Sequence, residues 1–387
     1  MNNEKRIGNK IRIHFLLFIL FLSVQIYAQQ NSRKEIKIPD ILGFKTLKCD
    51  FHIHTVFSDG DVWPDVRVEE AWKEGLDAIA ITDHIDYLPD RKDMVKDFNR
   101  SFEIANKLSD HYDIIVIKGA EITKKMPPGH FNMLFIQDAN SIDTTDYITA
   151  LKTAKNQGAF IQWNHPFWKN PNFPVKNSKT VWYPQHQELF DKGLLNGIEI
   201  ANDKEYYPVT FKWCIEEDLT ILGNSDIHSP TGYNYDFTKN EHRPITLVFA
   251  EKRNSEAIKE ALFAHRTAVY FNNMLLGKEK LLKEIFNKSV ELSQYKFEQK
   301  KGKSIFVQLT NNSDIPYSLI SSGKDEDFNF SQKLYLPSQR TVILQIDPIE
   351  EDFTGERNLI LSYRVKNLLT APDDILEIEF KIGITVK

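Results

Sequence analysis

The sequence has few cysteines, no repeats and no excess of charge of one sign that would by itself indicate a functional class. It has two cysteines in 387 residues, and it contains no internal repeat and no low-complexity tract. A hydrophobic content of 41% with 12% aromatic residues excludes a disordered, collagen-like or coiled-coil chain. Lys and Arg number 49 against 54 Asp and Glu, so no basic excess attracts long nucleic acid or anionic lipid. Any phosphorylated ligand must therefore be held locally.

The two cysteines predict no disulfide and no thiolate metal site. Cys49 lies in an apolar segment typical of a buried strand, and Cys214 lies in an amphipathic, helix-like segment. Neither has CxxC spacing. We expect two separate buried thiols.

Residues 1–28 are typical of a secretory signal peptide. Four basic residues precede the apolar run 13–24, and Ala28 offers a small residue before a polar stretch. Roughly twelve apolar residues fall short of the ~20 that span a bilayer, so cleavage after Ala28 is favoured over an uncleaved anchor. Cleavage would change the formal net charge from −5 to −8. We predict an exported, periplasmic protein without a stable membrane span, with residues 29–46 as a linker.

Residues 47–286 show short apolar segments that alternate with amphipathic ones, a pattern typical of an α/β domain with parallel strands. Seven strands suit a barrel better than an open sheet. The predicted strands are Lys48–His54, Ala78–Thr82, Ile114–Lys118, Asn132–Ile136, Ala159–Trp163, Gly197–Ile200 and Thr220–Gly223. The predicted helices are Asp65–Gly75, Asp93–Asp110, Thr144–Asn156, Val209–Asp218 and Ser255–His265.

Residues 287–387 change to a period of two and contain neither His nor Cys. The segments Ser304–Thr310, Lys333–Leu336, Thr341–Ile346, Asn358–Val365 and Ile375–Ile384 predict a small β-sandwich module. We expect this module to pack or dock and not to carry chemistry.

Nine residues with metal-ligand chemistry lie at or beside the ends of the predicted barrel strands. His52 and His54 are two apart, so both side chains leave an extended chain on one face, and Asp226 and His228 repeat this spacing. HxH or DxH alone is a weak signal. The conjunction is specific, because parallel strand ends converge on one rim where unrelated histidines have no reason to gather. The candidate ligands are His52, His54, Asp59, His84, Glu121, His130, His165, Asp226 and His228.

The ordered motifs HxH, SDG, TDH, GxE, GHxxxL, NHP and SDxH resemble the PHP (polymerase and histidinol phosphatase) family, most closely its secreted phosphodiesterase and phosphatase branch. The resemblance covers about residues 47–270. It implies a distorted (β/α)7 barrel with two or three metals at the strand ends. Many relatives have a histidine where this sequence has Asp59. Carried over by position, His52, His54, Glu121 and Asp226 would hold a first metal, Glu121, His130 and His165 a second, and Asp59, His84 and His228 a third.

These ligand types suit hydrolysis of phosphoesters. Mixed imidazole and carboxylate ligands favour zinc first, then manganese or iron, over magnesium. A water bridging two such cations loses a proton near neutral pH, and the hydroxide can attack phosphorus in line. Asp226 or Asp59 could move protons. Weaker substrate candidates are Asn164, Asn224 and Arg243, and an aromatic wall could be formed by Trp163, Phe167, Trp168, Trp182, Tyr183 and His186.

Two other functions stay open on sequence grounds. An amidohydrolase-type C–N or C–O hydrolase would usually add a bridging lysine, for which Lys118 is the near candidate, three residues before Glu121 and of the wrong parity. A non-catalytic binding protein would use its metals structurally, with closed shells. The expected partner is a small phosphorylated substrate and not long nucleic acid. The oligomeric state is left open.

Overall fold

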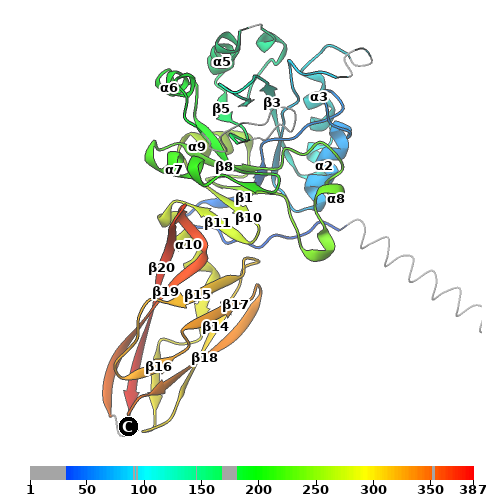
Figure 1. Ribbon diagram of the computed structural model, residues 1–387. Coiled ribbons are helices and arrows are strands. Elements are labelled where there is room, and N and C mark those ends of the chain that lie inside the picture. Colours follow the sequence, from blue (N-terminus) through cyan, green and yellow to red (C-terminus); the bar gives the residue numbers. More distant parts are fainter. Residues whose placement is uncertain (1–31, 90–91, 93–94, 145, 168–180, 351–353) are drawn as a thin grey trace, which may run out of the picture.

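The computed structural model describes residues 32–89, 92, 95–144, 146–167, 181–350 and 354–387. It places a barrel domain at one end and an elongated module of mostly antiparallel strands at the other (Figure 1). The proposed signal peptide and Trp168 lie outside the described residues. Among the residues that are described, no helix is long and apolar enough to cross a membrane.

Seven strands form the barrel, and each overlaps a strand that the sequence predicts. The first strand ends at Asp50, so His52 and His54 follow it and do not lie within it as predicted. Their order is β1-β2-β3-β4-β5-β6-β8. The ring closes where the chain beyond β8 meets the chain beyond β1: Ile53 and Ile227 form a parallel bridge, and the Asp226 amide donates to the His52 carbonyl at 2.9 Å. The strands are β1 (Lys45–Asp50), β2 (Ala78–Ile81), β3 (Ile115–Ile122), β4 (Phe131–Leu134), β5 (Phe160–Trp163), β6 (Gly197–Asn202) and β8 (Thr220–Asn224).

The direction of β4 differs from the all-parallel expectation. β4 pairs antiparallel with β3, Glu121 opposite Asn132, and antiparallel with β5 on its other side. The connection between β3 and β4 has eight residues, too short for the crossover that a parallel pair needs. The reversal brings the start of β4 to the rim where the parallel strands end, and His130 immediately precedes β4.

Helices surround the barrel, and local sequence explains several of their starts. Proline occupies the first turn of α2, and the side chains of Asp146 and Asn254 cap α5 and α9 by accepting from Thr149 and Ala257 amides. The segment predicted as one helix over 93–110 is split, and α6 was not predicted. The elements are α2 (Pro64–Lys73), α3 (Arg100–Asn106), α4 (Ser109–Tyr112), η1 (Asn140–Ile142), α5 (Tyr147–Asn156), α6 (Pro184–Asp191), β7 (Glu205–Tyr206), α7 (Pro208–Glu216), α8 (Thr231–Asn234), η2 (Phe237–Lys239) and α9 (Ser255–Phe263).

Three further strands extend the sheet from β1, and the sequence analysis did not predict them. They are β9 (Ile245–Ala250), β10 (Thr267–Phe271) and β11 (Met274–Gly277). β9 runs antiparallel beside β1, and β10 and β11 continue the antiparallel order. Asn272 and Asn273 both have positive φ and form the two-residue turn of the last hairpin, a conformation that asparagine tolerates.

The C-terminal module is a two-sheet β-sandwich that contains all five strands predicted for it. One sheet has the order β12-β14-β18-β16, and the other includes β13, β20, β19, β15 and β17. Its elements are α10 (Glu279–Ser289), β12 (Val290–Leu292), β13 (Lys296–Gln299), β14 (Ile305–Asn311), β15 (Tyr317–Ser321), β16 (Phe328–Phe330), β17 (Lys333–Leu336), β18 (Arg340–Pro348), β19 (Gly355–Ala371) and β20 (Asp374–Val386).

The barrel and the sandwich are joined by more than a linker. β11 pairs in parallel with β19, Leu275 opposite Leu368, and one hydrophobic cluster contains buried residues from both regions. Helix α10 spans the division expected at residues 286 and 287. Cys49 and Cys214 are both buried and unpaired with each other, as predicted.

Candidate metal centre

The nine candidate ligands meet at one end of the barrel. Those on the parallel strands follow the strand ends or, for Glu121, lie within the end of β3, and His130 precedes the antiparallel β4. They form three neighbouring groups, in each of which the potential ligand atoms all lie within 4.8 Å of one another. These groups contain His52, His54, Glu121 and Asp226; Glu121, His130 and His165; and His54, Asp59, His84 and His228.

The first group has the dimensions of a tetrahedral cation site. His52 Nε2 lies 2.8 Å from Glu121 Oε2 and 3.1 Å from Asp226 Oδ1. His54 Nε2 lies 3.0 Å from His52 Nε2 and 3.1 Å from each of the same two oxygens. Four ligands at zinc-like distances of about 2.0–2.1 Å would be about 3.3 Å apart. The observed atoms are nearly so spaced, so these residues fit a metal ion.

Charges in this group stabilise a cation. Burial alone would lower the pKa of His52, but the surrounding carboxylates, Asp226 foremost, raise it well above its ordinary value. Burial also opposes protonation of His54, yet hydrogen bonds to Asp226 and Glu121 raise its pKa to about 10. Glu121 is buried, which would raise its pKa, but His84 and His52 hold it well below the usual range. Two carboxylates that face one point create a negative potential there, and this potential favours a bound divalent cation.

The second group shares Glu121 with the first. Glu121 Oε2 faces the first group, whereas Oε1 lies 2.9 Å from His130 Nδ1 and 3.8 Å from His165 Nε2. The carboxylate thus turns one oxygen toward each group, as a bridging ligand does. Burial lowers the pKa of His130, which favours the neutral imidazole that ligation requires.

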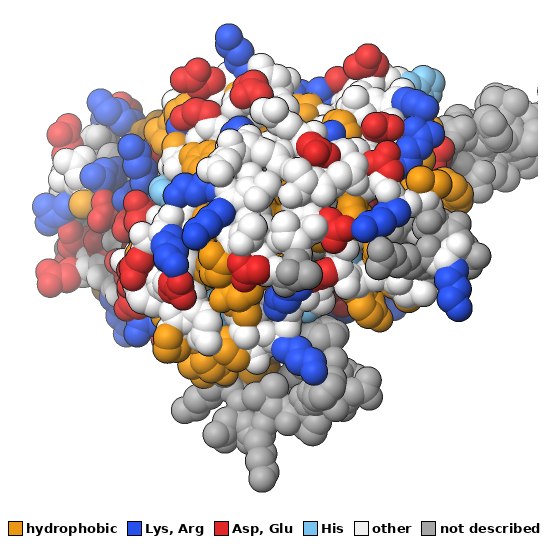
Figure 2. Space-filling model, turned by 90° about the horizontal axis from the view of Figure 1, so that it is seen from above, with side chains coloured by type: hydrophobic (Ala, Val, Ile, Leu, Met, Phe, Trp, Pro, Cys, Tyr) orange, Lys and Arg blue, Asp and Glu red, His pale blue; other side chains and the backbone are white. Residues whose placement is uncertain are grey.

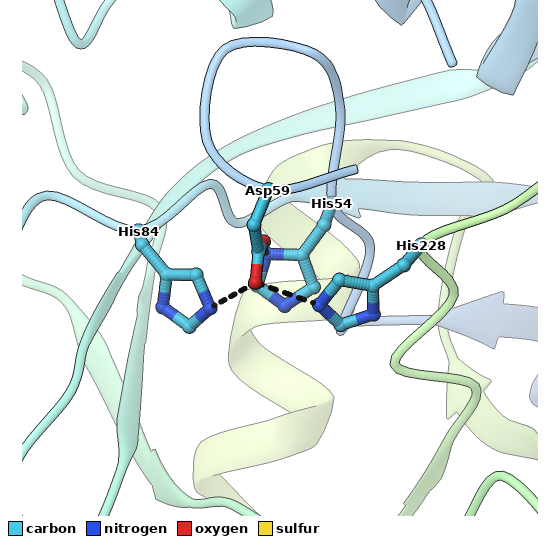
Figure 3. Close-up of side chains that lie close together, drawn as sticks. All are labelled: His54, Asp59, His84 and His228. Carbon is cyan, nitrogen blue, oxygen red and sulfur yellow. Dashed lines mark ion pairs between the residues drawn. The ribbon is translucent and has the colours of Figure 1, made fainter. Parts of the chain in front are cut away.

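The third group surrounds Asp59, which lies between two imidazoles (Figure 3). Asp59 Oδ2 is 3.5 Å from His84 Nε2 and 3.3 Å from His228 Nε2. The other ring nitrogens are engaged: His228 Nδ1 lies 2.7 Å from the Asp226 carbonyl, and His84 Nδ1 lies 2.6 Å from Thr123 Oγ1. His54 stands behind Asp59 with Nδ1 3.7 Å from Asp59 Oδ1. Asp226 and His228 belong to adjacent groups, and the chain between them is not regularly extended, since Asp226 has a left-handed backbone at φ 53°.

Arg243 is not a phosphate clamp, contrary to the sequence interpretation. Its side chain is 1% exposed, and its guanidinium donates to Asp50 Oδ2 at 2.9 Å and to both Glu74 oxygens at 2.8–2.9 Å. Asp50 in turn accepts from the Ser225 amide beside Asp226. Arg243 therefore supports the turn that carries a candidate ligand, and its burial keeps it from a substrate.

Asn164 and Asn224 are likewise buried supports and not substrate donors. The Asn164 amide nitrogen donates to Asn132 at 2.8 Å and its oxygen accepts from Gln162 at 3.1 Å. Asn224 accepts from the Phe51 amide at 2.9 Å and donates to Glu199 at 2.9 Å. Both are 0% exposed, so the proposal that they contact a phosphoryl group is wrong for this conformation.

The aromatic wall is also corrected in part. Trp163 is fully buried and stacks on His186 with ring centroids 3.7 Å apart. His186 is 0% exposed, accepts from the Tyr183 amide through Nδ1, and donates from Nε2 to the Pro128 carbonyl at 2.7 Å. These two rings belong to the core behind His130, whereas Trp182 and Tyr183 line a shallow surface depression with α6.

Three supporting residues escaped the sequence analysis. Asp83 accepts from the Thr55 amide and from Ser58 Oγ, both at 2.7 Å, and so orders the loop that presents Asp59. Arg67 is 1% exposed and donates to the backbone carbonyls of His54, Ile227 and His228. Glu199 contacts His52. The sequence signal for Asp83 was its place inside TDH, and the signal for Glu199 was its place as the lone charge in the apolar strand GIEIAN.

Comparison with known proteins follows this division of the molecule. A sequence model described as the PHP domain matches residues 50–217, and one described as an Ig-like domain matches residues 289–381. An uncharacterized protein of Methanocaldococcus jannaschii is 43% identical over an alignment of 201 residues that covers 48% of this chain and 83% of that protein.

A solved structure resembles nearly the whole chain. It is a Bacteroides vulgatus protein described as "a two-domain protein containing predicted PHP-like metal-dependent phosphoesterase". The identity is 40% and the TM-score 0.85, with 91% of this chain and 99% of that chain covered.

Proposed function

Because this chain belongs to the PHP domain family and is accordingly a metal-dependent hydrolase, we propose that it hydrolyses phosphoester bonds in small organic or nucleotide compounds. The observation that carries the proposal is the row of three adjacent groups of imidazoles and carboxylates. Two or three divalent cations held this closely suit an ester whose transition state spreads negative charge over several oxygens.

The exposure of the ligands favours catalysis over a structural role. His52, His54 and Glu121 have fully buried side chains, whereas Asp226 is 15% and His228 36% exposed. A structural site closes its shell, but a catalytic site keeps positions for water and substrate. The row of groups is therefore anchored in the barrel and reaches solvent at its outer side.

The residues divide the chemistry between them. Bound divalent ions would supply Lewis-acid stabilisation of the phosphoryl oxygens and acidify an attacking water. Glu121 would hold two ions in register through its two oxygens. Asp226 and Asp59 are the partly exposed carboxylates, so they would accept the proton of the attacking water and return it to the leaving oxygen. Mixed imidazole and carboxylate ligands favour zinc or manganese, with iron as a further candidate.

Charge supports a small substrate. On the face shown in Figure 2, basic and acidic side chains are interspersed over the barrel end. A chain with formal charge −5 and no basic excess favours a local contact with a small phosphorylated compound over binding of long nucleic acid. We further propose that residues 1–28 are a signal peptide and that the mature protein is exported to the periplasm.

The amidohydrolase alternative loses its candidate lysine. Lys118 Nζ donates to the Gln137 carbonyl at 2.8 Å and to Asn99 at 3.2 Å, and lies over the Phe102 ring. These contacts direct it to the outer, helix-covered side of β3, away from Glu121. A bridging role for Lys118 would require rearrangement of the strand.

The test combines metal analysis of the purified protein with hydrolysis of aryl phosphomonoesters and phosphodiesters. We expect two or three tightly bound divalent ions per chain, turnover that a chelator removes, and recovery with zinc or manganese. Hydrolysis of amides but of no phosphoester would favour the amidohydrolase alternative. Tightly bound metal without turnover of any ester would favour the binding-protein alternative.

A further inference from the structure

Glu199 is a buried carboxylate at the centre of the barrel, directly beneath the candidate metal centre. It lies in β6 and is 0% exposed. Its side chain has five hydrogen-bond partners, which come from the ends of β1, β5, β6 and β8. They are His52 Nδ1 at 2.8 Å, the His165 amide at 2.7 Å, Asn202 Nδ2 at 2.9 Å, Asn224 Nδ2 at 2.9 Å and Gln162 Nε2 at 3.3 Å.

The two oxygens serve different parts of the centre. Oε1 lies 2.8 Å from His52 Nδ1, and His52 Nε2 is turned toward Glu121. In the neutral imidazole that ligation requires, a proton on Nδ1 that is donated to Oε1 leaves Nε2 available for a cation. A carboxylate in this position fixes the tautomer and the ring orientation of a ligating histidine and makes its other nitrogen more basic. Oε2 accepts from the backbone amide of His165, a residue held at φ 25°. Few non-glycine residues adopt positive φ, so this bond helps to hold a conformation that would otherwise relax.

The two contacted histidines belong to different groups. His52 belongs to the first group and His165 to the second, and the only ligand that these groups share is Glu121. Asp226, a member of the first group, also lies 3.7 Å from His165 Nε2 through Oδ2. Glu199 adds a connection that leaves the ligand-bearing atoms free, because it contacts His52 at Nδ1 and His165 at the backbone amide. We infer that Glu199 is a positioning residue that fixes the first and second cation groups relative to each other, through the imidazole of His52 and the backbone of His165.

Surrounding amides explain why the carboxylate can do this while buried. Every partner is a donor, so the charge is balanced by five hydrogen bonds. Asn224 adds rigidity, because its side-chain oxygen accepts from the Phe51 amide next to His52. Replacement of Glu199 by glutamine would keep the volume but place an NH2 group among donors, so at least one bond to a ligand-bearing residue must be lost.

The test measures metal affinity and not turnover. Wild-type protein and the E199Q and E199D variants are equilibrated in chelator buffers of fixed free Zn²⁺, and bound zinc per chain is measured. We expect E199Q to lower the zinc affinity of both groups that share Glu121 by about 10–100-fold. The effect of E199D should be intermediate, because its carboxylate is one methylene shorter. The third equivalent, at Asp59, should change little.

Asp77→Asn is the matched control. Asp77 is a buried carboxylate of the same barrel that accepts from the Lys48 amide and pairs with Arg253, far along the strands from the ligands. We expect it to lower stability and to leave zinc affinity unchanged. If E199Q does not fold, the zinc affinity of E199D tests the inference, because this variant retains the negative charge.

The inference rests on the metal-binding part of the proposed function, and the two can fail separately. Wild-type protein that binds no divalent ion would overturn the proposed function itself. Wild-type protein that binds zinc while E199Q, or E199D in its place, binds both equivalents equally well would overturn only the role of Glu199. Weakening of one equivalent alone would contradict the linkage between the groups.

Discussion

At the scale of single residues, Glu121 is the carboxylate on which the centre depends. It is fully buried, and its two oxygens face four imidazoles in two groups. Asp226 also turns one oxygen toward each group, but its Oδ2 lies 3.7 Å from His165 Nε2, whereas Glu121 Oε1 lies 2.9 Å from His130 Nδ1. The family resemblance implied Glu121 as a shared ligand, and its two oxygens lie toward the two groups.

Glu121→Ala should remove turnover, because each of two cations would lose a ligand. We expect a fall in kcat of at least a hundredfold, on the order of what loss of an essential unit produces. Steady-state hydrolysis of an aryl phosphoester under saturating metal is the measurement, with Asp77→Asn as the control. Retention of more than about a tenth of wild-type activity would contradict the shared-carboxylate scheme.

His186 is a buried residue whose neutral form the fold requires. Burial lowers its pKa to about 4 from an ordinary value near 6.5, even though its bond to the Pro128 carbonyl favours the charged form. Between these two values the unfolded chain binds a proton that the folded chain does not. Stability should therefore fall as pH drops from about 6.5 to about 4, and change no further from this group at lower pH.

Between pH 6.5 and 4, His186 should lower the free energy of unfolding by up to about 3 kcal/mol, since each pKa unit corresponds to about 1.36 kcal/mol. His186→Gln should flatten the pH dependence of the free energy of unfolding between pH 4 and 6.5, measured by urea titration with chelator present. His111 is exposed, so His111→Gln should leave that dependence as in the wild type. If the free energy of unfolding changes with pH equally in the wild type and in His186→Gln, the fold does not lower the pKa of His186.

At the scale of elements, the loop between β1 and α2 is shaped by one close approach. Gly60 lies against the backbone of His54 and Thr55, and its amide donates to the Thr55 carbonyl at 3.0 Å. A Cβ at Gly60 would lie 2.8 Å from the His54 carbonyl carbon and 2.9 Å from the Thr55 nitrogen. Backbone atoms cannot move aside as a flexible side chain could, so the SDG motif needs glycine to present Asp59.

Gly60→Ala should displace Asp59 and so weaken the third cation group, because the loop must move outward. We expect one metal equivalent fewer per chain in buffered zinc, with the two equivalents at Glu121 retained. The cost in stability should be about 1–3 kcal/mol, as for other overpacked sites. Gly232→Ala is the control, since nothing lies within 4 Å of its Cβ position. A full complement of metal in Gly60→Ala would show that the loop tolerates the added carbon.

At the scale of the whole molecule, the barrel and the sandwich share one sheet and one core. The parallel pairing of β11 with β19 continues the barrel's sheet extension into the Ig-like domain, and α10 crosses between them (Figure 1). Asn367 strengthens the contact by donating to the Asn273 carbonyl at 2.8 Å. Leu368 is 0% exposed beside Leu275 at this junction.

We expect the metal-free protein to unfold by heat in a single transition, because separation of the two regions would expose this shared core. Leu368→Ala should cost about 2–5 kcal/mol and lower the midpoint of the whole transition. Ile360→Ala, on the same strand at 50% exposure, should have a much smaller effect. Calorimetry provides the measurement, and two separated transitions would show that the regions unfold independently.

The sequence by itself determined the inventory of the centre and the identity of the barrel strands. Ligand chemistry is local: His52, Glu121 and Asp226 are recognisable from residue type and from their place at apolar strand ends. Strand periodicity is local too, so all seven barrel strands and the five named strands of the sandwich were found.

Only the tertiary structure decided which residues meet, because pairing and burial depend on residues distant in the sequence. The antiparallel direction of β4, which brings His130 to the rim, depends on β3 continuing to Ile122, which leaves a connection too short for a parallel crossover. Arg243 and Asn224 have the chemistry of substrate donors, but the fold buries both and pairs them with supporting carboxylates. Glu199 became visible as a positioning residue only when four strand ends met around its carboxylate.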